Sequence, residues 1–212
     1  MVKMTEAVVK ATPLPVTVKT RLGWDDHTKN VEEVAERLQD VGIQALTIHG
    51  RTRAQMYKGE ADWALIREIK RNPRVKIPIF GNGDIDSPHK AAHWRMEFEV
   101  DGMMIGRAAI GYPWIFREVK HFFKTGELMP GPTLEERILA CRTHLSKSVE
   151  WKGPKVGVFE MRRHYANYFK GLPDFKPYRM QLVKEEQLSV IHEVLDEVAD
   201  KYALHSPFSE LA

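Results

Sequence analysis

Cysteine is nearly absent from this sequence of 212 residues, and its scarcity excludes whole classes of protein. The one cysteine, Cys141, cannot form an internal disulfide, which fits a reducing compartment. It falls on the apolar stripe of an expected helix, so a buried structural thiol is favoured over a nucleophile. No apolar run reaches the roughly 20 residues of a membrane-spanning helix, and the first residues lack the order of a signal peptide. We therefore predict a cytoplasmic protein.

Two kinds of binding motif are also missing. No pair of histidines or cysteines has the spacing of metal ligands, so no metal site is expected. The segment Gly81-Asn82-Gly83 does not complete the G-x-G-x-x-G pattern, and a Rossmann dinucleotide site is therefore not supported.

Four short β-branched runs are present, and helical patterns separate them, which is typical of a parallel sheet. The runs lie at residues 15–19, 45–49, 77–80 and 102–105. No strand pattern follows Arg107, and the remaining sequence has the spacing of a small helical bundle. A complete (β/α)8 barrel takes about 250 residues. The strand-rich part of this chain ends near Phe123, so only about half of a barrel fits. The predicted fold class is α/β: the C-terminal half of a (β/α)8 TIM-type barrel over residues 1–124, followed by an all-α helical bundle over residues 125–212.

Helix starts are marked by local signals. Asn30 with Glu33, and Thr133 with Glu136, each match the capping-box pattern. Ser87 before Pro88 predicts a further helix start, because proline suits the first helical turn.

Two strand ends break into glycines beside polar residues, at 80–85 and 104–111. Glycine lets the main chain approach a phosphate closely, and a following helix N-terminus favours negative charge. In (β/α)8 barrels a phosphate site is often built by the loops after the last two strands. Arg107 directly follows Gly106, and its planar guanidinium is suited to clamp that phosphate. For Asn82 and Asp84, a simple turn-forming role is the alternative.

Two cationic or titratable side chains end the first two strands. Side chains alternate along a strand, so Lys19 shares a side with Arg21 and projects near the carboxyl end, where barrel active sites lie. A lysine there can hold negative charge that develops on a bound cofactor or substrate; a solvent-facing lysine is an equal alternative. His49 ends the next strand in the equivalent place, although a structural histidine is the commoner case.

Positive charge is concentrated between residues 142 and 184, where ten lysines and arginines face three acidic residues. Such a block predicts a positive face for a polyanion, with a solvated helix surface as the equal alternative. Aromatic residues interleave with these charges, as in proteins that stack on RNA bases, although most of them are expected in the bundle core. The predicted nucleic-acid contacts are Arg51, Lys155, Arg162, Arg163 and His164, of which the last three form the densest cluster.

Four segments, read in order, resemble the tRNA-dihydrouridine synthases, and the bacterial B-type branch is the most similar. They are residues 15–24, 46–53 with His49-Gly50-Arg51-Thr52, 81–85 with Gly81-Asn82-Gly83-Asp84-Ile85, and 104–109 with Gly106-Arg107. Residues 111–116 and the basic helical tail are similar as well. The resemblance covers nearly the whole chain, and four motifs in this order are highly specific.

The resemblance implies an FMN-binding barrel and a helical tRNA-binding domain. Members of the family use NADPH to reduce the flavin, which passes a hydride to C6 of a tRNA uridine. The resemblance also implies that Lys19 and His49 approach the flavin ring. The residues that it places around the FMN phosphate and ribityl chain are Asn82, Gly83, Asp84, Gly106 and Arg107.

One part of the family pattern is missing from this sequence. The family's proton donor to C5 is a cysteine in the first half of the barrel, and Cys141 does not occupy that motif. We therefore expect no catalytic residue in this chain, weak or absent FMN binding, and no turnover by the chain alone. Either an upstream half completes the barrel, or two copies associate to cover the open edge.

Two other functions are compatible with these residues. A different FMN barrel oxidoreductase acting on a small molecule would leave the basic aromatic region without a purpose. A non-catalytic RNA-binding protein would retain the helical domain without the flavin.

Overall fold

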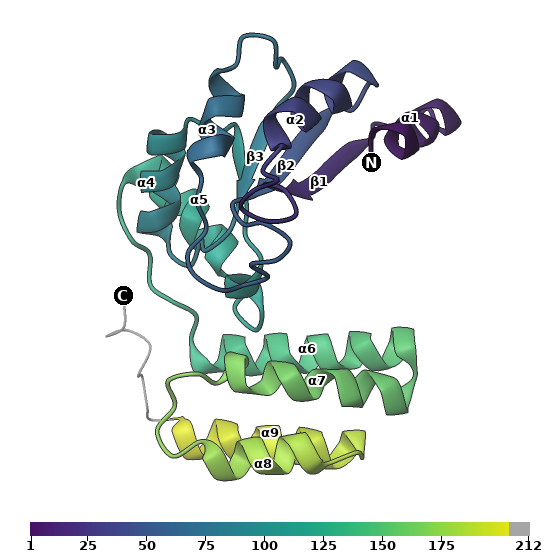
Figure 1. The fold of residues 1–212 in the computed structure, drawn as a ribbon. Coiled ribbons are helices and arrows are strands. Elements are labelled where there is room, and N and C mark those ends of the chain that lie inside the picture. Colours follow the sequence, from purple (N-terminus) through teal and green to yellow (C-terminus); the bar gives the residue numbers. More distant parts are fainter. Residues whose placement is uncertain (204–212) are drawn as a thin grey trace. The chain divides into compact units, whose positions relative to one another are not determined.

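The computed structural model describes residues 1–203 and divides the chain into two compact units, Met1–Arg107 and a second that begins at Ala108 (Figure 1). Each unit has its own elements and its own core. Within the described residues, no helix is both long and apolar enough to cross a membrane. Residues 204–212 of the predicted second domain lie outside the described part.

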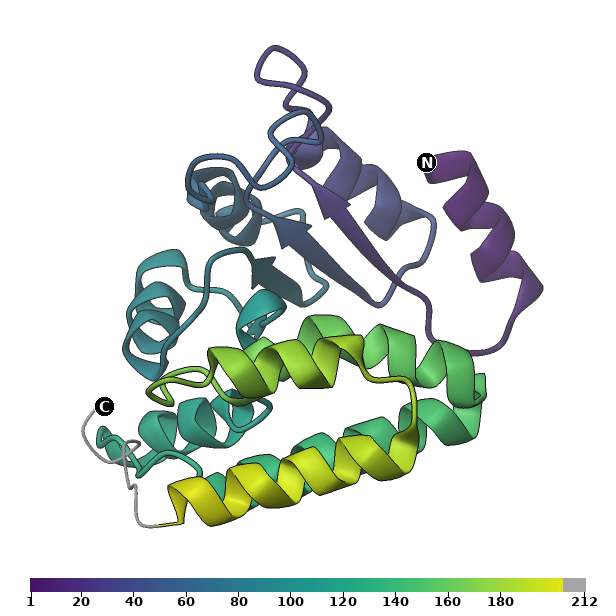
Figure 2. The same cartoon turned by 90° about the horizontal axis from the view of Figure 1, so that it is seen from below.

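The first unit alternates helices and strands. In chain order its elements are α1 (Val2–Ala11), β1 (Thr17–Arg21), α2 (Val31–Asp40), β2 (Ala45–His49), α3 (Ala64–Arg71), β3 (Ile79–Asn82), α4 (Pro88–Phe98) and β4 (Gly102–Met104). The strands form one parallel sheet in the order β1-β2-β3-β4, and their arrows point the same way in Figure 2. The predicted parallel α/β arrangement is confirmed.

One face of the sheet is apolar and covered by helices. Leu46 and Ile48 of β2 and Ile79 of β3 are fully buried on this face, as their alternation along the strands predicts. Trp63 lies so close to β3 that a Cβ built on Gly81 would sit 1.9 Å from its ring. Glycine at this position is therefore required by packing on the helix-covered face.

The opposite face of the sheet carries polar side chains. Strand register aligns Lys19 with Thr47, and it aligns Arg21, His49, Asn82 and Met104 in one row at the carboxyl edge. Parallel strands bring their carboxyl ends to the same edge, so residues far apart in sequence meet there. The fold thus brings the side chains of the row together at one edge of the sheet.

The second unit is helical within its described part. It contains α5 (Ile115–Thr125), α6 (Leu134–Lys152), α7 (Pro154–Tyr168), α8 (Lys176–Lys184) and α9 (Leu188–Tyr202); a short 3-10 turn, η1 (Arg107–Ala109), spans the unit boundary. The core of α6 to α9 includes Cys141, Leu145, Ile191 and Leu195. These four side chains are fully buried, which confirms the predicted apolar stripe of Cys141 and the helical spacing of this part of the chain.

Of the two predicted capping boxes, one is confirmed and one is wrong. At Thr133 the hydroxyl accepts from the Glu136 amide, and the Glu136 carboxylate accepts from the Thr133 amide. Asn30 does precede α2, but its side chain makes no capping hydrogen bond. Instead the amides of Asn30 and Val31 both donate to the Leu22 carbonyl. A backbone acceptor thus satisfies the Asn30 amide, which the Glu33 side chain was expected to serve.

Candidate cofactor site at the carboxyl edge of the sheet

The row at the carboxyl edge is held together by hydrogen bonds between neighbouring strand ends. The Asn82 side-chain amide donates to the Met104 carbonyl at 2.7 Å, and the Gly50 amide donates to the Asn82 carbonyl at 3.0 Å. Asn82 therefore links the ends of β2, β3 and β4 and holds the loops that follow them at a fixed distance. Its side-chain oxygen remains a further acceptor beside the row.

Arg51 lies just beyond β2 and is almost fully buried, with 2% of its side chain exposed. Its Nε donates to the Lys58 carbonyl at 3.2 Å, and Nη2 donates to the Gly59 carbonyl at 2.5 Å. Nη1 and Nη2 form a fork on the two carboxylate oxygens of Asp84, at 2.9 and 2.6 Å. The last donor points to Nε2 of His49 at 3.3 Å. All five guanidinium N–H groups thus have an acceptor.

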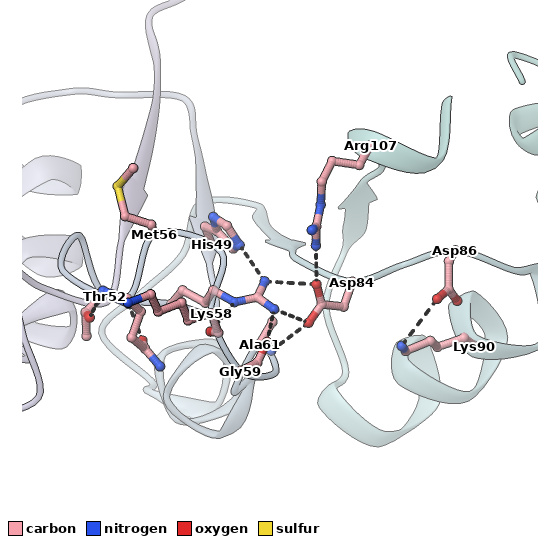
Figure 3. A network of polar contacts seen from close by, with 12 residues as sticks. His49, Thr52, Met56, Lys58, Gly59, Ala61, Asp84, Asp86, Lys90 and Arg107 are labelled. Atoms are coloured by element: carbon pink, nitrogen blue, oxygen red, sulfur yellow. Dashed lines mark hydrogen bonds and ion pairs between the residues drawn. The ribbon is translucent and has the colours of Figure 1, made fainter. Parts of the chain in front are cut away.

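Asp84 is the centre of this network, and Figure 3 shows it between Arg107 on one side and Ala61 on the other. One carboxylate oxygen accepts from Arg51 and from Arg107 at 2.6 Å, and the other accepts from Arg51 and from the Ala61 amide at 2.7 Å. A carboxylate offers about four acceptor positions, so all of them are filled. Asp84 therefore orients cations and has no acceptor position left for a donor group of a ligand.

The charge of Asp84 is stabilised by the same contacts. Burial by itself would raise the pKa of its carboxyl, but the hydrogen bonds from Arg51 and the Ala61 amide, with the charges of Arg51 and Arg107, lower the pKa below its usual value. The carboxylate is consequently ionised at neutral pH. Its backbone has a φ of +53°, which aspartate tolerates better than most residues.

Arg107 differs from Arg51 in that most of its side chain, 56%, is exposed. Asp84 engages one of its N–H groups, and its guanidinium lies 5.0 Å from the centre of the Tyr57 ring. The space beside the preceding Gly106 is open, because a Cβ built there meets nothing within 4 Å. An anchored cation next to an open main-chain segment is suited to receive an anionic group.

His49 is buried at the end of β2 and is held neutral by its surroundings. Burial lowers its pKa to about 4, helped by the positive charges of Arg21, Lys19 and Arg51, while Asp84 opposes the shift. Its ring lies against Gly83, where a Cβ would come within 3.0 Å of it. Gly83 also has a φ of +124°, so both backbone and packing require glycine.

Lys19 lies on the same face, one step back from the row. Partial burial, and then the charge of Arg21, lower the pKa of its ammonium group. Arg21 itself donates to the carbonyls of Thr52 and Met56, at 2.7 and 2.8 Å, and so ties down the loop that follows Arg51.

The structure thus brings together the residues predicted around a phosphorylated cofactor, namely Lys19, His49, Asn82, Gly83, Asp84, Gly106 and Arg107. Arg51 belongs to this group too, since its burial leaves no surface for the RNA contact that was predicted for it. Sequence reasoning did not foresee the contributions of Arg21 and Tyr57. The sequence did contain a signal for Arg21, because strand alternation places it on the same side as Lys19. For Tyr57 there was none, because it lies in a loop without a recognisable sequence motif.

The predicted nucleic-acid residues of the second unit lie on or near one stripe of α7. Lys155 and Arg163 are exposed, and Phe159 between them is 64% exposed, so the helical repeat places the three on one side. Arg162 is half-buried with its guanidinium 4.8 Å from the Phe159 ring centre. His164 is half-buried, and burial followed by the charge of His144 lowers its pKa.

The aromatic residues interleaved with these charges divide into two groups. Tyr165, Tyr168, Phe169 and Phe175 are buried in the core of the helical unit, as expected. Trp151, by contrast, is 83% exposed, with the Lys152 ammonium 5.0 Å from its ring centre. Trp151 and Phe159 are therefore two aromatic surfaces that this unit presents to solvent beside cations.

Comparisons with known proteins agree with this description. Residues 1–203 match the family described as Dihydrouridine synthase (Dus). The chain is 44% identical over 192 residues to a probable tRNA-dihydrouridine synthase 1 of Synechocystis sp., which covers 91% of this chain and 53% of that protein. It is 45% identical over 176 residues to the tRNA-dihydrouridine synthase B of Pseudomonas aeruginosa, with 83% and 52% covered.

A probable tRNA-dihydrouridine synthase of Rickettsia bellii is 43% identical over 177 residues, covering 84% of this chain and 54% of the relative. The chain spans about half the length of the curated relatives that it matches. The family match over almost the whole chain shows that this protein belongs to the dihydrouridine synthase family.

Proposed function

We propose that this chain supplies the flavin-binding and RNA-binding parts of a tRNA-dihydrouridine synthase. Its parallel sheet is interpreted as the C-terminal half of a (β/α)8 barrel over residues 1–124, and residues 125–212 as a helical tRNA-binding domain. Bound FMN, reduced by NADPH, supplies the hydride that converts a tRNA uridine into 5,6-dihydrouridine. Because tRNA is the proposed substrate, a cytoplasmic location is part of the proposal.

The residues at the carboxyl edge fit FMN in charge and in shape. Arg51 and Asp84 neutralise one another, so Arg107, Arg21 and Lys19 leave the edge positive, as a phosphate requires. The open space at Gly106 admits a phosphate to the main chain beside Arg107. These features support a phosphate contact by Gly106 and Arg107, with Asp84 acting through Arg107.

The remaining residues of the edge act on the ring end of the cofactor. Lys19 provides a positive charge, and its lowered pKa reflects the incomplete hydration that makes such a charge effective. His49 offers a neutral hydrogen-bonding group at neutral pH. Asn82 supports both by fixing the spacing of the strand ends.

The cysteine that donates the proton to C5 in the family has no counterpart in the family motifs of this chain. Its one cysteine, Cys141, is buried in the helical core, and burial raises its pKa to about 12. We propose that the proton donor is supplied by an upstream half that completes the barrel, or by a second copy that covers the open edge of the sheet. We expect no turnover by this chain alone.

The α7 surface is assigned to the tRNA. The cationic side chains of Lys155, Arg162 and Arg163 are suited to contact the phosphate backbone. The exposed rings of Phe159 and Trp151 are suited to stack on unpaired bases. Binding of tRNA to this chain is expected to weaken steeply with salt. Replacing Lys155 and Arg163 by alanine should weaken binding and flatten the salt dependence, whereas Lys147→Ala, on α6, should change both less.

The observation that carries the proposal is the exposed Arg107 anchored by Asp84 beside Gly106. The test is to titrate the chain with FMN and, separately, with riboflavin, which lacks the phosphate. Flavin fluorescence measures the binding of each. We expect weak binding with FMN preferred by roughly tenfold or more, as a charge-assisted contact provides. Arg107→Ala should abolish the preference, and Arg71→Ala, which breaks a distant ion pair, should keep it. Equal affinities for the two flavins would refute the assignment, whereas no binding of either would mean that the site requires an upstream half of the barrel.

A further inference from the structure

His49 and Arg51 are connected by a tight turn at the end of β2. The Arg51 amide donates to the His49 carbonyl at 2.7 Å, while the Gly50 amide between them donates to the next strand. The chain therefore reverses within three residues. This reversal brings the Arg51 guanidinium back against the imidazole that precedes it, with Nη1 3.3 Å from Nε2.

The chemistry of the pair decides which imidazole nitrogen carries the proton. A guanidinium has donors only and stays protonated, so the contact requires a lone pair on Nε2 of His49. A neutral imidazole with a lone pair on Nε2 has its proton on Nδ1. Figure 3 shows the other ring nitrogen of His49 pointing away from this contact.

We propose that Arg51 is a positioning residue, which holds His49 in the neutral Nδ1–H tautomer so that the imidazole presents a donor to a bound ligand. Because the Asp84 carboxylate on which Arg51 forks also holds Arg107, one buried ion pair orients both groups. The atom that His49 contacts is then an acceptor, such as a carbonyl oxygen or an unprotonated ring nitrogen. Only the identity of that ligand, a flavin, rests on the proposed function.

Arg51 is suited to this role because it cannot turn away. Its Nε and Nη2 are held by the carbonyls of Lys58 and Gly59, and its fork by both oxygens of Asp84. Breaking the His49 contact would require moving all of these partners together. A lysine at this position would lack the planar fork that fixes the direction of the donor.

The positive groups around His49 all act in the same direction, and Asp84 opposes them. Arg21 and Lys19 approach from β1 and Arg51 from the loop after β2, all of them positive, whereas Asp84 from the loop after β3 is the one negative group. The Tyr57 ring lies 6.3 Å from the imidazole. A second proton on His49 would place Nε2–H against an Arg51 donor, so both charge and hydrogen bonding exclude the imidazolium at neutral pH.

The test is the tautomer of His49, measured on the chain without any flavin. Long-range ¹H–¹⁵N correlation spectra of ¹⁵N-histidine-labelled protein at pH 7 distinguish a protonated nitrogen from one with a lone pair. Among the nine histidines, His49 is assigned by the signals lost in His49→Gln. We expect a protonated Nδ1 and an unprotonated Nε2; a proton on Nε2, or on both nitrogens, overturns the proposal.

A variant pair isolates the contribution of Arg51. In Arg51→Met the ratio of Nδ1–H to Nε2–H should fall by about tenfold or more, because the charged donor to Nε2 is lost. Arg53→Met removes an equal charge from the same loop without contact to His49 and should leave the ratio unchanged. Equal ratios in Arg51→Met and the unsubstituted chain overturn the proposal.

Should Arg51→Met not fold, the spectrum of the unsubstituted chain still decides between the two tautomers. The FMN and riboflavin titration is independent of this spectrum. If the flavin preference fails and the tautomer is found as expected, the proposed function falls and the positioning role stands.

Discussion

Replacing Asp84 by asparagine removes the charge at the centre of the network while keeping the shape of the side chain. Arg51 would keep its charge at 2% exposure, with no carboxylate to balance it. The new amide group can accept on one atom only, and in either orientation its NH₂ meets an Arg51 donor together with a donor from Arg107 or from the Ala61 amide. Asp84→Asn therefore combines an unpaired buried charge with a clash of donors.

The expected cost follows from the burial of the pair. Breaking a buried ion pair by removing one partner costs about 3 to 5 kcal/mol, and the 15% exposure of Asp84 favours the lower end. We predict a loss of about 3 kcal/mol in the free energy of unfolding of the first unit. Glu99→Gln is the matched control, since Arg71 forms the same fork on Glu99 at 3.0 and 2.8 Å on the surface. Solvent screening should make its effect much smaller.

Native-state hydrogen exchange of amides in β2 and β3 measures this loss separately from the helical unit. The pH dependence provides a second check. The folded-state pKa of Asp84 is lowered, so its contribution is fully present above the ordinary carboxyl value near 4 and is lost as pH falls through the folded pKa. The difference between Asp84→Asn and the unsubstituted chain should shrink in that acidic range. A loss at pH 7 no larger than that of Glu99→Gln would contradict the reasoning.

Three further predictions concern other parts of the fold. Thr133→Ala should destabilise the second unit by about 1 kcal/mol through the lost cap of α6, and Asn30→Ala should cost the first unit less, since Asn30 makes no side-chain cap; urea unfolding of each variant measures the difference. Gly81→Ala should displace Trp63, cost roughly 1 to 3 kcal/mol by overpacking, and shift the tryptophan emission to longer wavelength. Cys141 should resist alkylation at pH 8 in the folded protein, because burial raises its pKa to about 12, and should react at once in denaturant; rapid labelling of the native chain would show that the thiol is accessible.

Local patterns in the sequence predict the elements of this fold well. Alternating apolar runs indicate the four parallel strands, and stripes such as the one containing Cys141 and Leu145 indicate the buried sides of the long helices. These predictions succeed because strand and helix periodicities are properties of neighbouring residues. The Asn30 capping box fails because its competitor, the Leu22 carbonyl, comes from a segment that folds back on the helix start.

For the candidate site, the sequence predicts which residues lie at the strand ends. It does not predict which of them form hydrogen bonds and ion pairs with one another. The glycines and polar residues after each strand, together with the family resemblance, point to Lys19, His49, Asn82 and Arg107. Their shared edge follows from parallel strand order alone. Asp84 was expected beside the FMN phosphate and ribityl chain, and the structure adds that its four acceptor positions are filled by protein donors, which suits it to orient cations.

Local sequence patterns are enough to predict a parallel α/β unit followed by helices, with cations at strand ends and along the helix that became α7. Tertiary structure alone decided what Arg51 does. Its sequence position beside His49 and its charge suggested a surface contact, yet the turn after β2 folds its guanidinium inward onto Asp84 and Nε2 of His49. The reason is physical: which donor meets which acceptor depends on loops that approach one another across the sheet, and no local pattern records that approach.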